Sequence, residues 1–305
     1  MLKEFPHSSK IELESRGIFE AAYRNLPPSV SDLVFTNLFS WQDIYPYRIS
    51  AVDRFLLIHY REDDKYIFLP PLLLDGKINA ADFGPAFASA AQCIGDFCSK
   101  HGLGAEFRFV PELYLKYMKK DAYAPAQERD YSDYMYKRDN LARLPGQKYS
   151  AKRNLIKQFQ RKYSGAYEPL SENNLHLVYK LLETDGSKTD YKVIERMVKN
   201  FVPLGLTGGL LISSGQVIAG TIGTVVGNFL YKKGCYNAAV VHFEKARLDH
   251  KGAYQAINNY FSSTLGENID YVNREEDLGL EGLRKAKMSY HPDRLIEKYR
   301  FIISN

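Results

Sequence analysis

The sequence predicts an α+β fold made of two tandem units, each a mixed β-sheet flanked by helices. Three observations support this prediction. The last hundred residues contain a glycine-punctuated β-meander followed by a helix, an apolar strand and a second helix. A similar order of elements occurs about 160 residues earlier. The chain has 305 residues, of which 45% are hydrophobic, and this is enough for two domains of the usual size.

The first unit opens with a helix and continues with strands. Residues 11–25 predict the helix, which ends before Pro27 and Pro28 because proline disfavours helix in the residue before it. Residues 47–74 predict short antiparallel strands separated by the turn sequence REDDK.

A longer helix follows, with Pro85 near its start and Gly102 at its stop. Residues 105–110 then predict a strand and residues 112–120 another helix. The start of the longer helix, DFGPAFASAA, has no basic side chain to neutralise a phosphate. We therefore expect no site for a phosphate-bearing donor molecule in the first unit.

The second unit repeats this order. Residues 228–236 predict a strand, residues 247–264 a helix, residues 269–273 a strand and residues 279–290 a helix. Residue identity between the two units is low, so the repeat is one of pattern, and it predicts a duplicated domain.

A basic helix connects the units. It opens at Pro145 and Gly146 and ends near Gly165, and we place the domain boundary just before it, between residues 1–140 and 141–305. Cations at i, i+4 and i+8 form a stripe beside the apolar face. This stripe is either a solvated face or a possible RNA-binding surface. Its candidate residues are Lys148, Lys152, Arg153, Lys157 and Arg161.

Composition narrows the class of protein. A net charge of +5 permits a polyanionic partner but is far below that of a dedicated DNA-binding protein. The three cysteines form no CxxC or Cys/His ligand spacing, so neither a disulfide framework nor a metal site is expected. The sequence contains no signal peptide and no apolar run that could span a membrane. We expect a soluble cytoplasmic protein.

The glycines of the β-meander do not predict a phosphate loop. Gly220, Gly223 and Gly227 have the spacing GxxGxxxG among β-branched residues, and no helix starts after them. Glycine inside a strand more often marks a bulge or a close backbone approach. The sequence also lacks the GxSxG elbow of a Ser/His/Asp acyltransferase.

A strand-to-helix connection is the better candidate for anion binding. Lys245, Arg247 and Lys251 surround a predicted helix start at Gly252, where unpaired amides attract negative charge. Acetyl-CoA users place the pattern Q/RxxGxG/A here, and this chain has Arg247 followed by Gly252. The alternative is a solvated, charged helix cap.

Two blocks of residues carry a resemblance to a known family. In the first block, Glu244, two further residues and Arg247 precede the Gly252 helix start. The second block consists of Gly282, Leu283, Arg284, Lys287, Tyr290, Pro292, Lys298 and Tyr299. Together with the basic segment PGQKYSAKRNLIKQF, these two blocks resemble the DUF2156 family. The chain is similar over most of its length to the cytosolic C-terminal domain of phosphatidylglycerol lysyltransferase.

The resemblance implies two tandem GNAT-like (acyl-CoA N-acyltransferase) domains and transfer of an aminoacyl group from charged tRNA to a lipid headgroup. The sequence has no counterpart of the lysyltransferase's membrane-embedded half, and Glu244 stands where aspartate is expected. The acceptor therefore stays open among a small molecule, a peptide and a lipid headgroup, as does peripheral membrane contact.

The resemblance also suggests roles for individual residues. Acyl transfer needs a proton acceptor, a stabilised oxyanion and an oriented donor. We assign Glu244, Lys287 and Tyr290 to catalysis, as base or orienting group, charge stabiliser and proton donor. The donor-binding candidates are Lys245, Arg247, Lys251, Gly252 and Arg284.

Two hypotheses follow for the function. The first is an acyltransferase that uses aminoacyl-tRNA or acyl-CoA as co-substrate, without a tightly bound cofactor, and an amine or hydroxyl acceptor. The second is a catalytically silent GNAT-derived module that binds RNA or a metabolite. The two hypotheses predict different clefts. An enzyme needs a cleft that is open to Glu244, Arg247 and Lys287, whereas a binding module can have this cleft filled by side chains.

Overall fold

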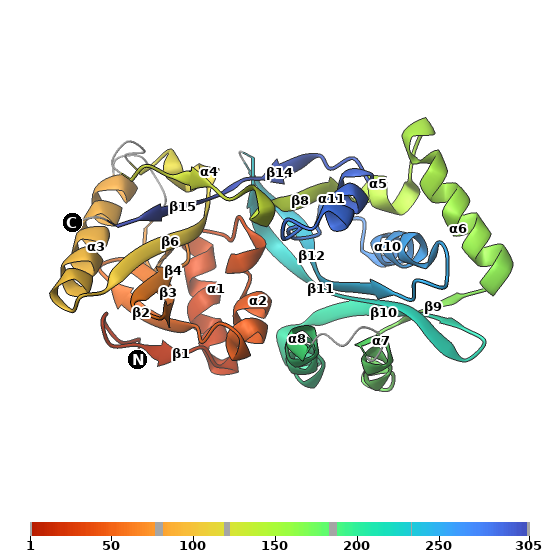
Figure 1. Ribbon diagram of the computed structural model, residues 1–305, viewed down its shortest axis with the longest axis horizontal. Helices are drawn as coiled ribbons and strands as arrows, with labels where there is room; N and C mark the ends of the chain where they lie inside the picture. Colours follow the sequence, from red (N-terminus) through yellow and green to blue (C-terminus); the bar gives the residue numbers. More distant parts are fainter. Residues whose placement is uncertain (1, 77–81, 119–122, 183–187, 233, 304–305) are drawn as a thin grey trace.

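Two mixed β-sheets lie side by side along the long axis of the molecule, each with helices packed against it (Figure 1). The computed structural model describes residues 2–76, 82–118, 123–182, 188–232 and 234–303. The predicted α+β architecture with two mixed sheets is confirmed. No helix among these residues is long and apolar enough to cross a membrane.

The first sheet has the strand order β1-β2-β3-β4-β6-β15-β7, and β5 pairs with β3. All pairings are antiparallel except β4 with β6, which run parallel. The strands are β1 (Ser9–Lys10), β2 (Arg48–Val52), β3 (Phe55–Glu62), β4 (Lys65–Phe68), β5 (Leu72–Leu73), β6 (Gly104–Pro111), β7 (Ala126–Gln127) and β15 (Lys298–Ile302).

Both faces of the first sheet are covered. Along β3, Phe55 and Leu57 pack in one apolar cluster while Leu56 and Ile58 pack in another, as the two-residue period of a strand requires. The first cluster includes α3, and the second includes α1 and α2. These helices are α1 (Arg16–Asn25), α2 (Phe35–Ser40), α3 (Phe83–Lys100) and the short α4 (Glu112–Leu115).

The second sheet has the order β14-β8-β13-β12-β11-β10-β9. Only β12 and β13 pair in parallel. Its strands are β8 (Asp133–Lys137), β9 (Ala166–Pro169), β10 (Leu206–Ser213), β11 (Gln216–Tyr231), β12 (Gly234–Ala246), β13 (Tyr271–Asn273) and β14 (Arg294–Ile296).

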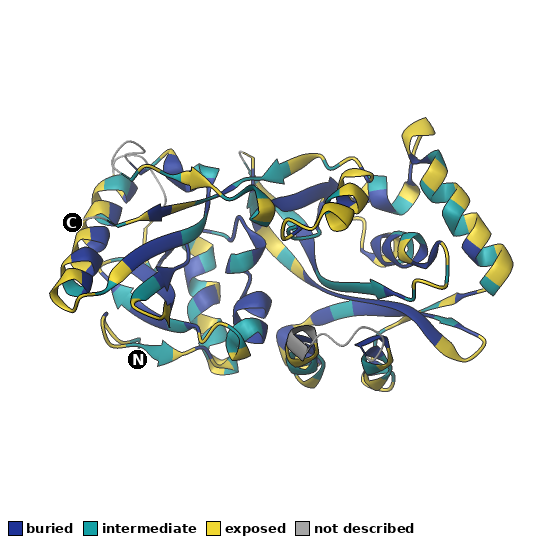
Figure 2. Cartoon of the chain, viewed as in Figure 1, coloured by how far each residue is buried: buried dark blue, intermediate teal, exposed yellow. Residues whose placement is uncertain are grey.

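Helices cover both faces of this sheet as well. Leu211 and Ile218 pack with residues of α10 and α6, whereas Leu210 and Ile222 pack with residues of α7 and α8 and with the first half. Figure 2 shows α6 as a largely exposed arm at the edge of the molecule. The helices are α5 (Arg138–Arg143), α6 (Ser150–Tyr163), α7 (Tyr179–Leu182), α8 (Lys188–Lys199), α9 (Phe201–Leu204), α10 (Ala253–Thr264) and α11 (Glu281–Met288).

The pattern repeat predicted from the sequence is present. In the first half β2, β3 and β4 form a meander followed by α3 and then β6, parallel to β4. In the second half β10, β11 and β12 are followed by α10 and then β13, parallel to β12. A helix follows each parallel strand, α4 in the first half and α11 in the second.

The two sheets exchange strands. β8 leaves the first half and pairs with β13, while β15 returns from the second half and pairs with β6. The proposed boundary at residues 140 and 141 therefore separates two chain segments that each complete the other's sheet. As a division into domains it stays a prediction.

Three predicted elements have wrong boundaries. The strand expected over residues 228–236 is the end of β11 and the start of β12. The helix expected over residues 247–264 begins at Ala253, because β12 continues to Ala246 and a turn follows it. The helix expected over residues 112–120 ends as α4 at Leu115, and part of its span lies outside the described residues.

A charged cluster lies at the junction of the halves. The ammonium group of Lys298, on β15, is fully buried and lies 2.5 Å from a carboxylate oxygen of Asp32, 2.7 Å from Asp133 and 3.7 Å from Glu276. Asp133 also accepts hydrogen bonds from Ser31. Buried charges must be compensated locally, so this cluster fixes the returning strand against both halves.

Candidate active site

The candidate active site lies where β12 and β13 separate. The two strands pair in parallel only from Ala238 with Tyr271 to Val240 with Asn273. Beyond that point β12 runs on to Ala246, while the chain after Asn273 turns away. Side chains from the two diverging segments therefore face each other.

Two polar pairs bridge the gap between these segments. Nδ1 of His242 lies 2.8 Å from Oε1 of Glu275, and Nη2 of Arg274 donates to Oε1 of Glu244 at 2.7 Å. The second oxygen of Glu244 accepts from Nδ2 of Asn258, on α10, at 3.0 Å. Glu244 is thus held by Arg274, after β13, and by Asn258, on α10.

The guanidinium of Arg274 is the centre of the site. It lies 4.9 Å from the ring centroid of Tyr290 and 5.7 Å from that of Tyr136. Burial disfavours its charge, but attraction to Glu244 and the two tyrosines leaves the pKa of Arg274 above its ordinary value. Its Nη1 is buried and has no hydrogen-bond partner among the described residues. A buried donor without a partner is suited to binding an anionic group.

Lys287, on α11, supports this part of the chain. Its Nζ donates to the carbonyl oxygen of Arg274 at 2.5 Å and to that of Glu276. Burial, and secondly the positive charge of Arg274, lowers the pKa of Lys287 to about 8. Burial also raises the pKa of Tyr290 well above its usual range, so the phenol stays protonated at neutral pH.

Lys152 reaches the same site from α6. Its Nζ lies 4.1 Å from the ring centroid of Tyr290 and donates to Oγ of Ser289 at 2.6 Å. Burial, followed by the charge of Arg274, lowers the pKa of Lys152 to about 8. The basic helix therefore contributes one side chain, Lys152, to this cluster, and its other face is solvated.

The three residues expected to be catalytic lie around one arginine. Glu244 pairs with Arg274, Lys287 holds the backbone of Arg274, and Tyr290 stacks on its guanidinium. Their catalytic roles stay predictions.

The expected donor-binding residues are not part of this group. Arg247 pairs with Asp249 at 3.1 Å and is about one-third exposed, and it forms no ion pair with Glu244 among the described residues. The reason is local, because Glu244 lies on a strand and Arg247 lies in the loop after it. Donor binding by Arg247 stays a prediction. Arg284 pairs with Asp277 and Asp130.

The helix start at Gly252 is closed by packing. Gly252 has a φ of +93°, and a Cβ there would meet the carbonyl oxygen of Leu155, on α6, at 2.3 Å. Lys251 is exposed, and Lys245 lies on β12 opposite Gly220. These three residues stay predicted donor contacts. The close approach of α6 explains why a residue without a side chain is needed at Gly252.

Most of the expected RNA contacts lie on the exposed arm. Lys148, Lys157 and Arg161 are exposed, whereas Arg153 donates to the carbonyl oxygens of Leu144 and Gly146 at 2.5 and 2.7 Å. Arg153 thus has a structural task at the start of α6.

Sequence reasoning did not single out Arg274, Asn258 or Tyr136. Each pairs with a residue far away in the chain, for example Arg274 with Glu244 across thirty positions. One signal for Arg274 was available in the sequence. It is a basic residue directly after a short apolar strand, and in many sheets ligands bind at the carboxyl ends of the strands.

Comparison with known proteins agrees with this architecture. The family model "Phosphatidylglycerol lysyltransferase, C-terminal" matches residues 23–302, so the chain belongs to this family. No curated protein sequence matches the chain significantly.

Solved structures show the same fold. A conserved protein of unknown function from Bacteroides thetaiotaomicron is 29% identical, with a TM-score of 0.81 over 97% of this chain and 99% of that one. The C-terminal DUF2156 domain of a putative lysylphosphatidylglycerol synthetase from Agrobacterium fabrum is 11% identical, with a TM-score of 0.63 over 95% and 93%.

A tandem GNAT protein from the clavulanic acid biosynthesis pathway is 9% identical, with a TM-score of 0.53 over 98% of this chain and 99% of that one. The expected DUF2156 membership and tandem GNAT-like fold are confirmed. Family and fold together point to acyl transfer.

Proposed function

We propose that this protein transfers an aminoacyl group from charged tRNA, or an acyl group from acyl-CoA, to an amine or hydroxyl acceptor. One observation carries the proposal: the buried guanidinium of Arg274, held by Glu244 and stacked on Tyr290, keeps Nη1 without a partner among the described residues. It stands where β12 and the chain after β13 diverge, in a member of the lysyltransferase family.

The chemistry requires one bond exchange. The acceptor's nitrogen or oxygen forms a bond to the acyl carbon, the ester or thioester bond breaks, and the acceptor's proton ends on the leaving oxygen or sulfur. Charge that develops on the carbonyl oxygen is stabilised by fixed donors in a site with little water. Arg274 is suited to this task, and the protonated phenol of Tyr290 is suited to supplying the leaving group with a proton.

Three cations favour an anionic donor molecule. Lys152 and Arg274 both lie over the ring of Tyr290. Lys287 donates to the backbone carbonyl of Arg274. Glu244 is the acid that pairs with Arg274. Phosphates or a sugar–phosphate backbone would meet this field favourably. The carboxylate of Glu244 orients Arg274 through its bond to Asn258.

The basic arm favours tRNA over acyl-CoA as the source of the acyl group. α6 carries Lys152, Arg153, Lys157, Arg161 and Lys162 and no acidic residue. Because Lys152 of the same helix reaches the ring of Tyr290, an RNA backbone lying along the arm would bring its end toward Tyr290.

The test uses a radiolabelled aminoacyl-tRNA, the same tRNA uncharged, and a radiolabelled acyl-CoA, each with a cell extract as acceptor source. We expect label from the charged tRNA to appear in a stable product with the wild type and to be lost with Lys287→Met. Transfer from acyl-CoA alone would identify the other donor. Binding of charged and uncharged tRNA alike, without any transfer, would instead support a silent RNA-binding module.

A further inference from the structure

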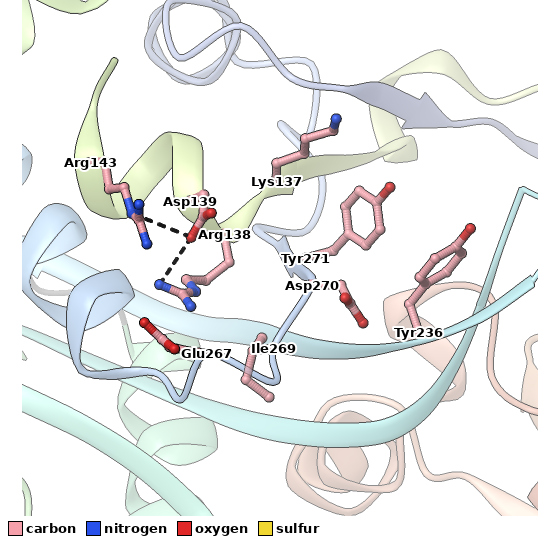
Figure 3. A pocket seen from close by; sticks show the side chains of 9 residues that line it. All are labelled: Lys137, Arg138, Asp139, Arg143, Tyr236, Glu267, Ile269, Asp270 and Tyr271. Carbon is pink, nitrogen blue, oxygen red and sulfur yellow. Dashed lines mark ion pairs between the residues drawn. The ribbon is translucent and has the colours of Figure 1, made fainter.

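A pocket lies at the opposite end of the second sheet from Glu244 and Arg274, where β12 and β13 begin and β8 ends. Its volume is about 420 Å³, and its walls come from Lys137 at the end of β8, Arg138 at the start of α5, Tyr236 on β12, Tyr271 on β13 and the loop with Glu267 (Figure 3). This size falls in the range of small-molecule sites, about 300 to 1,000 Å³.

The pocket is built around a buried cation. Arg138 is only 6% exposed, and its Nε is buried without a hydrogen-bond partner among the described residues. The guanidinium makes one ion pair, between Nη1 and the exposed Asp139 at 3.1 Å. A guanidinium has five N–H donors in a planar fork, so Arg138 has donors left for a carboxylate.

Positive and negative groups are balanced in the pocket. Three of its side chains are cationic and three are acidic. Glu267 forms no ion pair with any described residue, and the same holds for Lys137. Because uncompensated acids repel anions as strongly as cations attract them, this lining disfavours a phosphate and favours a ligand with both charges.

Two tyrosine rings form another part of the wall. The rings of Tyr236 and Tyr271 lie 5.1 Å apart, edge to face. In the view of Figure 3 these rings lie on one side, with Asp270 beside them, and Arg138 and Glu267 lie on the other. The pocket therefore offers an aromatic surface next to its ionic groups.

We propose that this pocket binds a free α-amino acid with an aromatic or long apolar side chain. Arg138 holds the carboxylate, Glu267 holds the ammonium group, and the side chain packs on Tyr236 and Tyr271. This assignment is independent of the proposed acyl transfer, since the pocket shares no residue with the Glu244 and Arg274 site. Eight residues of β12 separate Tyr236 from Glu244, about 26 Å in an extended strand.

The experiment measures binding of three matched probes by saturation-transfer NMR and calorimetry: phenylalanine, phenylpropionate without the ammonium, and phenethylamine without the carboxylate. We expect phenylalanine to saturate the wild type and each truncated probe to bind about tenfold more weakly, because each loses one charged hydrogen-bond partner. Equal binding of phenylpropionate and phenylalanine would overturn the ligand class, and no saturation by phenylalanine or leucine would overturn the site.

Variants locate the binding. Arg138→Gln and Glu267→Gln should each weaken phenylalanine binding about tenfold. Glu267 is exposed, so its variant is expected to fold even if the Arg138 variant does not. Glu244→Gln, in the other site, should leave the affinity unchanged. Loss of binding in Glu244→Gln with no change in Glu267→Gln would overturn the proposal.

Discussion

The two halves of this protein use the same order of strands and helices around two different interiors. In the first half, β4 pairs in parallel with β6 from Lys65 to its last residue, Phe68. In the second half, β12 pairs with β13 over three positions and then continues for six residues beside β11, without β13. Polar side chains of β12 and of the chain after β13 meet beyond this pairing.

The side chains at these positions differ in kind. The first half fills the space beside its parallel strands with rings: the centroid of Phe107 lies 5.2 Å from that of Phe68 and 5.3 Å from that of Phe87, on α3. In the second half α10 presents Asn258 to Glu244, which pairs with Arg274. The same architecture thus supports an inert core or a polar site, according to a few residues at the strand ends.

The largest effect should come from the junction between the halves. Lys298→Met removes the cation shared by Asp32, Asp133 and Glu276 and should cost about 3–5 kcal/mol in the free energy of unfolding. Chemical denaturation followed by circular dichroism measures it. Arg300→Gln, on the same strand but more than half exposed, should change stability by less than about 0.5 kcal/mol. Equal effects would show that the junction does not depend on this cluster.

The next prediction tests whether the active site lies at Arg274 or at Arg247. Arg274→Lys keeps the charge but loses the planar fork that joins Glu244 and Tyr290, and it should lower the rate of acyl transfer about a hundredfold. Arg247→Lys is the matched control, because Arg247 pairs only with the adjacent Asp249 among the described residues. A larger loss in Arg247→Lys than in Arg274→Lys, at equal fold stability, would restore the assignment made from the sequence.

The junction also predicts a pH dependence. Burial raises the pKa of Asp32 to about 6 and that of Glu276 to about 8. Both folded-state values lie above those of the unfolded chain, so the folded state holds extra protons and its stability decreases as pH rises from about 4 to about 8. In Glu276→Gln the free energy of unfolding should depend less on pH above pH 6, because Asp32 titrates near pH 6 and Glu276 is the group of this pair that titrates above it. Unfolding titrations from pH 5 to pH 9 measure this, and an unchanged slope would contradict it.

The smallest effect compares one helix from each half. α6 has five cations and no acid, whereas α3 has one lysine and one aspartate, Lys100 and Asp96. The double variant Lys157→Glu with Arg161→Glu should weaken tRNA binding and reduce the salt slope by about 1.5 to 2, because fewer counterions are released. Lys100→Glu should leave both unchanged. If the tRNA affinity and the salt slope are the same in the two variants, the arm is a solvated face.

Local sequence determined the repeated order of elements. The alternation of Phe55, Leu56, Leu57 and Ile58 encodes a strand buried on both faces. The apolar spacing of α3 and α10 encodes helices, since residues three or four apart share a face. Family membership could likewise be predicted, because the motif around Gly282 and Lys287 lies within one stretch of chain.

Tertiary structure decided how distant segments combine. No periodicity in the sequence shows that β8 pairs with β13 and β15 with β6. For the same reason the partner of Glu244 is Arg274, thirty residues away, and not Arg247, three residues away. Local patterns report which face of an element is apolar, but the contacts between polar side chains depend on where whole strands are placed. That placement comes from packing the two halves against each other, and it decides which charges meet around Arg274.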